Sequence, residues 1–211
     1  MDYQFDVFIS YRRHPEWTPW TREHFRNLLD AYLTQDLSVQ PSIFVDEHIE
    51  PGADWPQRLG DSIARARVLL PIFSGDYFGS EWCLHELDLM HARLLRFPDK
   101  ILIVPVVGHD GKLIPAEIAR LQPADFLQFR NTDLQRRTPR YEQFADAVQR
   151  LAPVVASAIV AAPAFDPAWV PECRDRFDQV YAAHCGGPTV PVTTLTLKPL
   201  PFPTRPPRVS M

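Results

Sequence analysis

The 211-residue chain has little of what several protein classes require. Its three cysteines, Cys83, Cys173 and Cys185, form no CxxC pair and leave one over, which argues against a disulfide framework and against a zinc knuckle. The eight glycines are scattered, and no GxxxxGK[S/T] or GxGxxG segment occurs. Neither a nucleoside triphosphatase nor a redox dinucleotide fold is therefore supported. We expect a reduced, cytoplasmic location.

Long apolar runs and an excess of basic charge are also missing. The stretch richest in apolar residues, 151–165, contains Pro153 and Pro163 and is shorter than the roughly 20 residues that a membrane helix needs. The first residues lack the basic start and apolar block of a signal peptide. A net charge of -4 argues against a protein that binds the nucleic-acid backbone. The seven histidines show no ligand spacing, so no membrane, nucleic acid or metal is expected as a partner.

Proline, in contrast, is abundant and unevenly placed. Of 22 prolines, twelve fall within residues 1–162 and ten within 163–211. Because proline lacks an N–H and fixes φ, the run at 198–207 cannot form a helix or a central strand. We predict a compact domain at 1–162 and a Pro-rich C-terminal extension at 163–211. The extension is expected to contain a short helix (171–183), an edge strand (190–197) and an extended tail that packs on its own domain or on a neighbour, or docks on a partner through a PxxP motif.

Before residue 162, short apolar runs alternate with amphipathic stretches. The runs predict strands at 5–10, 42–45, 68–73, 101–104 and, more weakly, 124–129. The amphipathic stretches predict helices at 20–33, 55–66, 81–94 with Ser80 as N-cap, and 144–159. Apolar strands joined by helices indicate an α/β fold, here a flavodoxin-like, doubly wound parallel five-stranded sheet flanked by helices. Ligands bind beyond the carboxyl ends of such strands.

Three segments that follow strand ends resemble the TIR domain family. Residues 5–13, FDVFISYRR, are similar to its first-strand box, and 44–52, from Phe-Val-Asp to Pro-Gly, are similar to its second strand and BB loop. Residues 74–87 resemble its S…Y…SxWCxxEL segment. Three boxes in this order are more specific than each alone, and the resemblance covers about residues 3–160.

The resemblance implies two possible roles, because TIR domains include non-enzymatic adaptors and enzymes that cleave NAD⁺. In the enzymes, the glutamate that ends a WxxxE pattern is catalytic, and here that pattern runs from Trp82 to Glu86. The bacterial NADases and the animal axon-degeneration NADase share this spacing. The resemblance further implies self-association, filaments included, a site completed across two protomers, and a separate sensor or effector protein as a partner.

The chemistry fits a single carboxylate. Cleavage of the nicotinamide–ribose bond creates an oxocarbenium-like ribose, and nicotinamide leaves as a neutral molecule, so the second carboxylate of ordinary glycosidases is not needed. Glu86 would stabilise the cation, and Trp82, four residues before it on the same helix face, would flank the ligand. Arg12 and Arg13 follow the first strand, where a pyrophosphate could accept a forked guanidinium contact. Ser10 and Tyr11 are expected in the same pocket.

The BB-loop segment allows more than one interpretation. Glu47 corresponds to a BB-loop carboxylate of some enzymatic relatives, but this loop is one residue shorter, so the role could fall on His48. The segment 46–54 could equally serve as an assembly loop. Cys83 falls in the apolar stripe of its helix and is interpreted as a buried small hydrophobe.

The leading hypothesis is a TIR NAD⁺ glycohydrolase or cyclase of bacterial anti-phage defence. It would release nicotinamide and ADP-ribose in linear, cyclic or conjugated form, with NAD⁺ as substrate and no cofactor. The first alternative is a non-enzymatic TIR–TIR adaptor, or an effector that interferes with host TIR signalling. The second is a nucleoside-processing enzyme of the deoxyribosyltransferase type.

Overall fold

The computed structural model describes residues 2–45, 55–109, 113–130 and 134–196. Within them, five parallel strands form one sheet in the order β2-β1-β3-β4-β5. The strands are β1 (Phe5–Tyr11), β2 (Ile43–Val45), β3 (Ala66–Phe73), β4 (Val106–Val107) and β5 (Ala124–Asp125). The expected fold class is confirmed. The strand order reverses between β1 and β3, and in such sheets a ligand crevice opens at this switch point.

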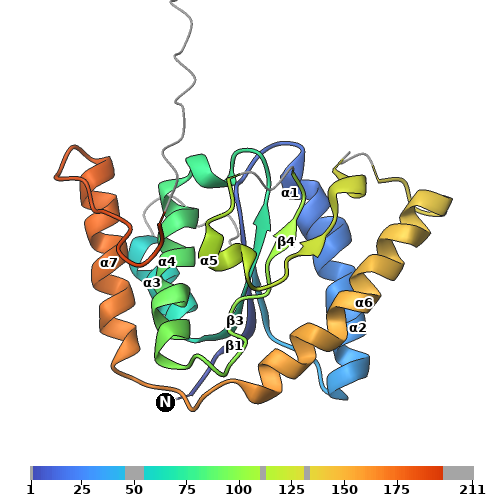
Figure 1. Ribbon diagram of the computed structural model, residues 1–211, viewed down its shortest axis with the longest axis horizontal. Coiled ribbons are helices and arrows are strands. Elements are labelled where there is room, and N and C mark those ends of the chain that lie inside the picture. Colours follow the sequence, from blue (N-terminus) through green and yellow to red (C-terminus); the bar gives the residue numbers. More distant parts are fainter. Residues whose placement is uncertain (1, 46–54, 110–112, 131–133, 197–211) are drawn as a thin grey trace, which may run out of the picture.

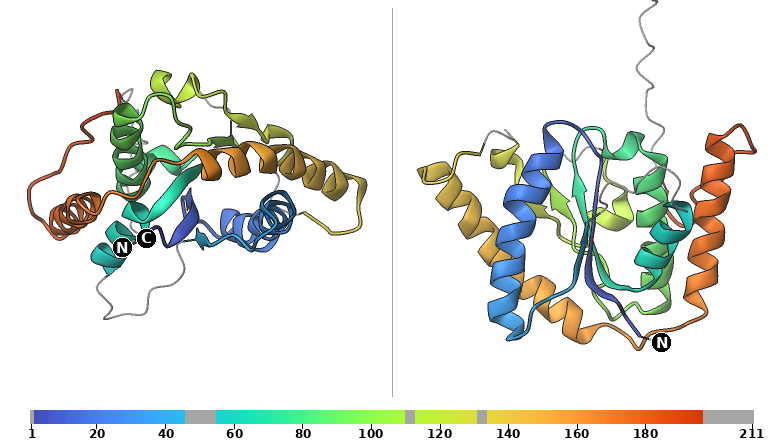
Figure 2. Two further views of the ribbon diagram at one scale, coloured as in Figure 1. Left: turned by 90° about the horizontal axis from the view of Figure 1, so that it is seen from below. Right: turned by 180° about the vertical axis from the view of Figure 1, so that it is seen from behind.

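Helices cover both faces of the sheet (Figures 1 and 2). The α-helices are α1 (Trp17–Pro19), α2 (Arg26–Leu37), α3 (Trp55–Ala64), α4 (Glu81–Arg96), α5 (Ala116–Ala119), α6 (Pro139–Ala161) and α7 (Trp169–His184). A π-helical segment, η1 (Trp20–Phe25), joins α1 to α2, and the 3₁₀ turns are η2 (Tyr77–Gly79) and η3 (Leu127–Phe129). Helices α2 and α6 lie on one face of the sheet, and α3 and α4 lie on the other, with α7 outside them (Figure 1).

The sheet separates two apolar cores because successive side chains of a strand point to opposite faces. In β1, Val7 and Ile9 join the core under α2 and α6, whereas Phe8 joins the core under α3, α4 and α7. Leu70 and Leu69 of β3 divide in the same way. Burial on both faces explains why these strands are apolar at nearly every position.

The fourth and fifth strands are shorter than the sequence predicts. Residues 101–104 make only one bridge, between Ile103 and Leu69, and the paired strand β4 begins at Val106. Pro71 and Pro105 lie in the gap between the bridge and β4, and neither has an N–H to donate to a ladder. The predicted strand at 124–129 ends after Asp125, whose carboxylate accepts a 2.8 Å hydrogen bond from the Leu127 N–H and turns the chain into η3.

Helix α6 is 23 residues long and has the mean hydropathy of a membrane-spanning segment. Half of its most apolar window is buried inside the structure, and its buried side chains, including Phe144, Leu151 and Val155, belong to the core shared with α2. A core helix of a globular domain passes the same test of length and composition, so this helix carries no argument for a membrane.

The C-terminal extension forms the predicted helix as α7, but the predicted edge strand at 190–197 is wrong over its described part, 190–196. These residues have no strand pairing. Thr193 and Thr194 instead direct their N–H and hydroxyl groups to the Asp88 carboxylate of α4. A side-chain acceptor therefore replaces the strand ladder as the partner of this backbone. The boundary at residue 162 stays a prediction.

Candidate active site

Glu86 lies at the switch point of the sheet, on the first half of α4. The Ser80 hydroxyl accepts a 3.4 Å hydrogen bond from the Cys83 N–H and so caps the helix, as the sequence predicts. Cys83, Leu87 and Met90 are buried in the core and fix the rotation of the helix about its axis. This rotation turns Glu86 inward, and only 4% of it is exposed. A buried glutamate is uncommon and indicates a specific partner or a role in chemistry.

The partner of Glu86 comes from the end of β1. The Ser10 hydroxyl donates a hydrogen bond of 2.5 Å to Oε2 of Glu86, and it lies 2.8 Å from the Tyr77 hydroxyl. Because Ser10 has one hydroxyl proton and gives it to the carboxylate, the proton of the second contact comes from Tyr77. The Tyr77 hydroxyl also donates to the Cys83 carbonyl at 3.2 Å, so its single proton is shared between the two acceptors. The three side chains thus form one hydrogen-bonded chain that ends on the carboxylate.

Burial keeps the far end of this chain neutral. Tyr77 is fully buried, and burial raises the pKa of its phenol well above the usual value, with the neighbouring Cys83 and Glu86 acting in the same direction. The phenol therefore keeps its proton at neutral pH, and Tyr77 donates it to the hydroxyl oxygen of Ser10.

A cavity of about 180 Å³ opens next to Glu86. Its walls come from the end of β1, the start of α3 and the first turns of α4. The lining residues are Ile9, Ser10, Tyr11, Arg12, Arg13, Trp55, Ser80, Trp82, Cys83 and Glu86. The structure brings together every predicted site residue that it describes, and the prediction that Trp82 and Glu86 share a helix face is confirmed by their common cavity.

Aromatic side chains form one wall of this cavity. The Trp82 ring packs against the Trp55 ring with a centroid distance of 4.1 Å and an angle of 66° between the ring planes. On α7, the Phe177 ring lies nearly parallel to Trp82, at 6.0 Å and 5°. Phe177 is completely buried, whereas Trp82 is partly exposed toward the cavity. Sequence reasoning missed Trp55 and Phe177, because only the packing of three helices brings them to Trp82.

Two arginines stand at the mouth of the cavity. Arg12 and Arg13 are exposed, and Arg12 donates a 3.4 Å hydrogen bond to the Ser80 hydroxyl. Arg13 and Tyr11 also line an adjoining cavity of about 450 Å³, to which His14 and Arg22 contribute. No described residue that lines this adjoining cavity is acidic. The mouth of the Glu86 cavity is thus suited to an anionic group, while its floor carries a carboxylate.

The predicted BB-loop residues Glu47 and His48 lie outside the described part of the chain. Cys83 is buried, as the sequence predicts. Tyr77 lies inside the segment 74–87 that resembles the TIR family, but its role could not be predicted from the sequence alone. The signal that could have identified Tyr77 is its place in the sequence, three residues before the N-cap of α4.

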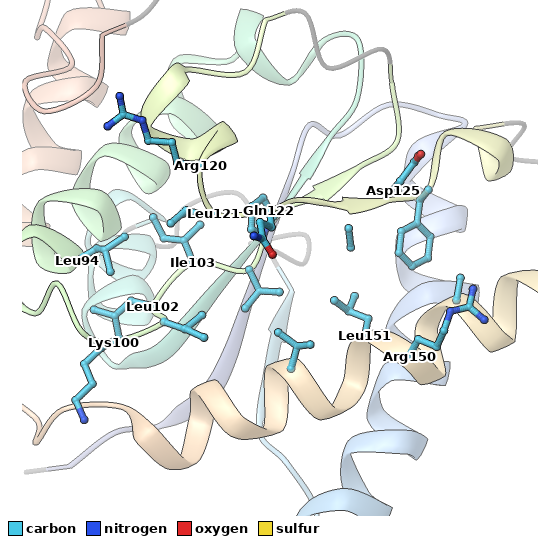
Figure 3. Close-up of a pocket in the computed structure, with 17 residues that line it drawn as sticks. Leu94, Lys100, Leu102, Ile103, Arg120, Leu121, Gln122, Asp125, Arg150 and Leu151 are labelled. Atoms are coloured by element: carbon cyan, nitrogen blue, oxygen red, sulfur yellow. The ribbon is translucent and has the colours of Figure 1, made fainter.

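A larger cavity, of about 470 Å³, lies on the β4–β5 side of the sheet and has a mostly apolar lining (Figure 3). Ile103, Leu121 and Leu151 project toward it from the strand region, the α5 end and α6, with Arg120 and Arg150 at its rim (Figure 3). Its only described carboxylate is that of Asp125. The predicted site residues, Glu86 among them, line the smaller cavity, and we therefore place the candidate active site there.

A sequence profile of the TIR domain matches residues 7–144. The protein SUPPRESSOR OF npr1-1, CONSTITUTIVE 1 of Arabidopsis thaliana is 27% identical over 106 residues, which are 50% of this chain and 7% of that protein. Toll-like receptor 2 of Canis lupus familiaris is 27% identical over 131 residues, 57% of this chain and 15% of the receptor. The disease resistance protein RPP2B of Arabidopsis thaliana is 30% identical over 99 residues, 47% of this chain and 8% of that protein. The chain thus spans less than a sixth of the length of these curated relatives.

Two solved structures resemble the fold. The TIR domains of the activated Roq1 resistosome, which directly recognises the pathogen effector XopQ, align with a TM-score of 0.39 and 20% identity over 84% of this chain and 99% of that one. The TIR domain of the Toll-related receptor TRR-2 from Hydra magnipapillata aligns with a TM-score of 0.38 and 19% identity, over 60% of this chain and 87% of that one.

Proposed function

The chain belongs to the TIR domain family, and from this premise we propose that it is an NAD⁺ glycohydrolase with Glu86 as its catalytic residue. The observation that carries the proposal is the buried Glu86 carboxylate, held by Ser10 on the floor of a cavity with an aromatic wall and arginines at its mouth. An adaptor surface has no need for a buried carboxylate in a cavity.

The reaction cleaves the bond between the ribose C1′ and the nicotinamide nitrogen. The bonding electron pair leaves with nicotinamide, which becomes neutral, and the positive charge passes to the ribose. Water adds to C1′ and releases one proton, so the products are nicotinamide, ADP-ribose and a proton. A cyclic product would form if a nitrogen of the adenine attacked C1′ in place of water.

Glu86 is suited to the charge that develops in this step. Its carboxylate would stabilise the oxocarbenium-like ribose, and a fixed negative charge in a site shielded from water acts more strongly than one in bulk solvent. The hydrogen bond from Ser10 holds that carboxylate in one orientation before the substrate arrives. Trp82 would lie against the nicotinamide ring, and Arg12 or Arg13 would contact the pyrophosphate.

The size of the cavity limits what it can hold alone. Sites that bury a drug-sized ligand span about 300–1,000 Å³, and the Glu86 cavity has about 180 Å³. One end of the dinucleotide would fit there, and the remainder would extend past Arg13, toward the adjoining cavity.

Self-association is the second part of the proposal. The apolar groove of Figure 3, with Ile101 and Val154 exposed at 49% and 46%, offers a surface for a second copy.

We further propose a role in immune defence, including defence against phage. The relatives named as disease resistance protein and Toll-like receptor support the immune part of this role, and the phage part rests on the resemblance to bacterial TIR domains. The non-enzymatic adaptor is the second candidate, favoured by the same apolar groove.

The decisive experiment measures nicotinamide release from NAD⁺ by wild type and Glu86→Gln, at low and high protein concentration. Glu81→Gln, an exposed glutamate in the first turn of the same helix, is the matched control. We expect release by wild type and control, a loss of about a hundredfold or more in Glu86→Gln, and a rate that rises faster than linearly with protein concentration. Equal release by all three proteins would contradict the site. No release at any concentration would favour the adaptor, and release of base from simple nucleosides without NAD⁺ cleavage would favour the nucleoside-processing enzyme.

A further inference from the structure

The aromatic wall of the Glu86 cavity depends on a segment outside the region that the TIR profile matches. The profile ends at residue 144, and Phe177 lies on α7. The Phe177 ring stacks on Trp82 with the two planes 5° apart, and the His184 ring meets the same indole at 6.4 Å. Trp82 therefore has Trp55 and the extension as its ring neighbours.

We infer that Phe177 is a positioning residue for the Glu86 site, and that the C-terminal extension through residue 196 is part of the catalytic unit. The inference rests on the proposed function. A tryptophan that forms one wall of a cavity must keep a single orientation to select a flat ligand ring, and an offset parallel ring at 6.0 Å restricts its rotation.

Helix α7 is held closely enough to α3 to serve as a rigid support. A β-carbon added at Gly60 would lie 2.8 Å from the Arg174 Cα, so the two helix backbones approach each other more closely than another residue would permit. The Arg174 guanidinium also forms two hydrogen bonds with Asp61, of 2.5 and 2.6 Å. Such paired contacts fix orientation as well as distance.

A second attachment joins α7 to α4, the helix that carries Glu86. The Asp88 carboxylate accepts hydrogen bonds from the N–H and hydroxyl groups of Thr193 and Thr194 at 2.5–3.0 Å. On α7, Arg176 donates to the Pro191 carbonyl at 2.9 Å and to the Thr193 hydroxyl at 3.0 Å. We call this group the Asp88 clasp: Asp88, Arg176, Pro191, Thr193 and Thr194. Through it, the segment 191–194 is hydrogen-bonded to both α4 and α7.

Residues on different faces of α4 thus have separate tasks. Trp82 and Glu86, four positions apart, face the cavity, while Asp88 faces the extension. The clasp fixes α7 relative to α4, and Phe177 then reaches the back of Trp82 at a defined position. Loss of the Phe177 ring is expected to loosen the cavity wall without removing Glu86 or Ser10.

The test compares Phe177→Leu with Val170→Ala in the full chain. Both changes reduce the apolar packing of buried side chains of α7, but Val170 lies about 10 Å along the helix from Phe177. We expect Phe177→Leu to raise KM for NAD⁺ about five- to ten-fold, with kcat changed by less than about two-fold, because a wall residue acts on ground state and transition state alike. Val170→Ala should leave KM unchanged. Equal KM values for the two variants would overturn the inference.

A readout without turnover keeps the inference distinguishable from the proposed function. The near-ultraviolet circular dichroism of Phe177→Leu, Trp82→Phe and the double variant forms a cycle. If the two rings are coupled, the Phe177→Leu difference spectrum largely disappears in the Trp82→Phe background; an unchanged difference spectrum would overturn the positioning role. A wild type that cleaves no NAD⁺ at any concentration would overturn the proposed function, and the cycle would still decide whether Phe177 holds the indole.

Discussion

Ser10 and Glu86, 76 residues apart in the sequence, meet through a hydrogen bond of 2.5 Å between the serine hydroxyl and Oε2 of the carboxylate. Ser10 is the penultimate residue of β1, and Glu86 lies on the helix that follows β3, so the contact spans the switch point of the sheet. Both side chains are at least 96% buried. A carboxylate that accepts a hydrogen bond in a buried site keeps a fixed orientation, which is a requirement for electrostatic stabilisation of a transition state.

Ser10→Ala is expected to lower kcat for nicotinamide release about ten-fold, with a smaller change in KM. The carboxylate would remain but would lose its orienting donor, and charge-assisted hydrogen bonds of this kind contribute about 1.5–3 kcal/mol. Initial-rate kinetics over a range of NAD⁺ concentrations separate the two constants. Ser74→Ala is the matched control, because Ser74 is also buried at a strand end and its hydroxyl has no partner among the described residues. Identical kcat values for the two variants would contradict the orienting role.

Arg13→Gln is expected to raise KM for NAD⁺ about ten-fold and to change KM for nicotinamide riboside little. The guanidinium lies at the mouth of the Glu86 cavity and lines the adjoining one, so it would face the pyrophosphate, which the riboside lacks. Competition between the two substrates in one assay provides the ratio of their kcat/KM values directly. Arg12→Gln tests which of the two arginines carries the contact. An equal effect on both substrates would point to a structural role for the arginine.

The sequence predicts which residues come together around Glu86 better than it predicts the fourth and fifth strands of the sheet. Periodicity locates β1, β3 and α4, and the motif that runs from Trp82 to Glu86 places both side chains on one helix face. Tertiary packing, which no local pattern records, decides that Phe177 reaches Trp82. The fourth strand is misplaced because its apolar run, 101–104, is a stronger local signal than the two prolines that interrupt the ladder.

The Thr/Val alternation at 190–197 shows a related limit. Alternation of this kind is typical of an edge strand, yet the backbone at 193 and 194 binds a carboxylate of α4. The sequence does not reveal this, because Asp88 lies 105 residues before Thr193 and looks like an ordinary helix aspartate. Only its burial, with 1% exposed, distinguishes it.

Asp88→Asn is expected to destabilise the protein by about 3 kcal/mol, or about 8 °C in Tm. An asparagine amide offers one acceptor oxygen in place of two and turns an N–H₂ group toward donors, so part of the Asp88 clasp is lost. Thermal melts of Asp88→Asn and of Asp175→Asn, an exposed aspartate of α7, provide the comparison. Equal melting temperatures would show that the clasp contributes nothing.

The clasp aspartate also has a defined dependence on pH. Burial alone would raise the pKa of Asp88, but the hydrogen bonds from Thr194 and Thr193 outweigh burial and lower this pKa below its usual value. Because the folded-state pKa is lower than the unfolded one, the stabilisation by Asp88 is complete above about pH 4. It is lost as the pH falls through the lowered pKa, and the stability of Asp88→Asn should approach that of wild type in this acidic range.

His85, beside Glu86 on α4, titrates in a higher pH window. Burial lowers its pKa to about 4, repulsion from Arg176 acts in the same direction, and Asp88 and the Val190 backbone oppose it. His85 is 3% exposed, and its Nδ1 has no hydrogen-bond partner among the described residues. The folded protein therefore holds a neutral imidazole here at neutral pH, whereas an unfolded chain takes up a proton near pH 6.5.

The free energy of unfolding should consequently fall as the pH is lowered from 6.5 to 4. In this window the unfolded chain binds one more proton at His85 than the folded one, which corresponds to about 3 kcal/mol in total. His91 and His24, whose pKa values burial also lowers, add to the slope in the same direction. His85→Gln removes the first contribution, so urea titrations at pH 7.5, 5.5 and 4.5 should show a smaller loss of stability in the variant than in wild type. Parallel curves for the two proteins would contradict a neutral buried His85.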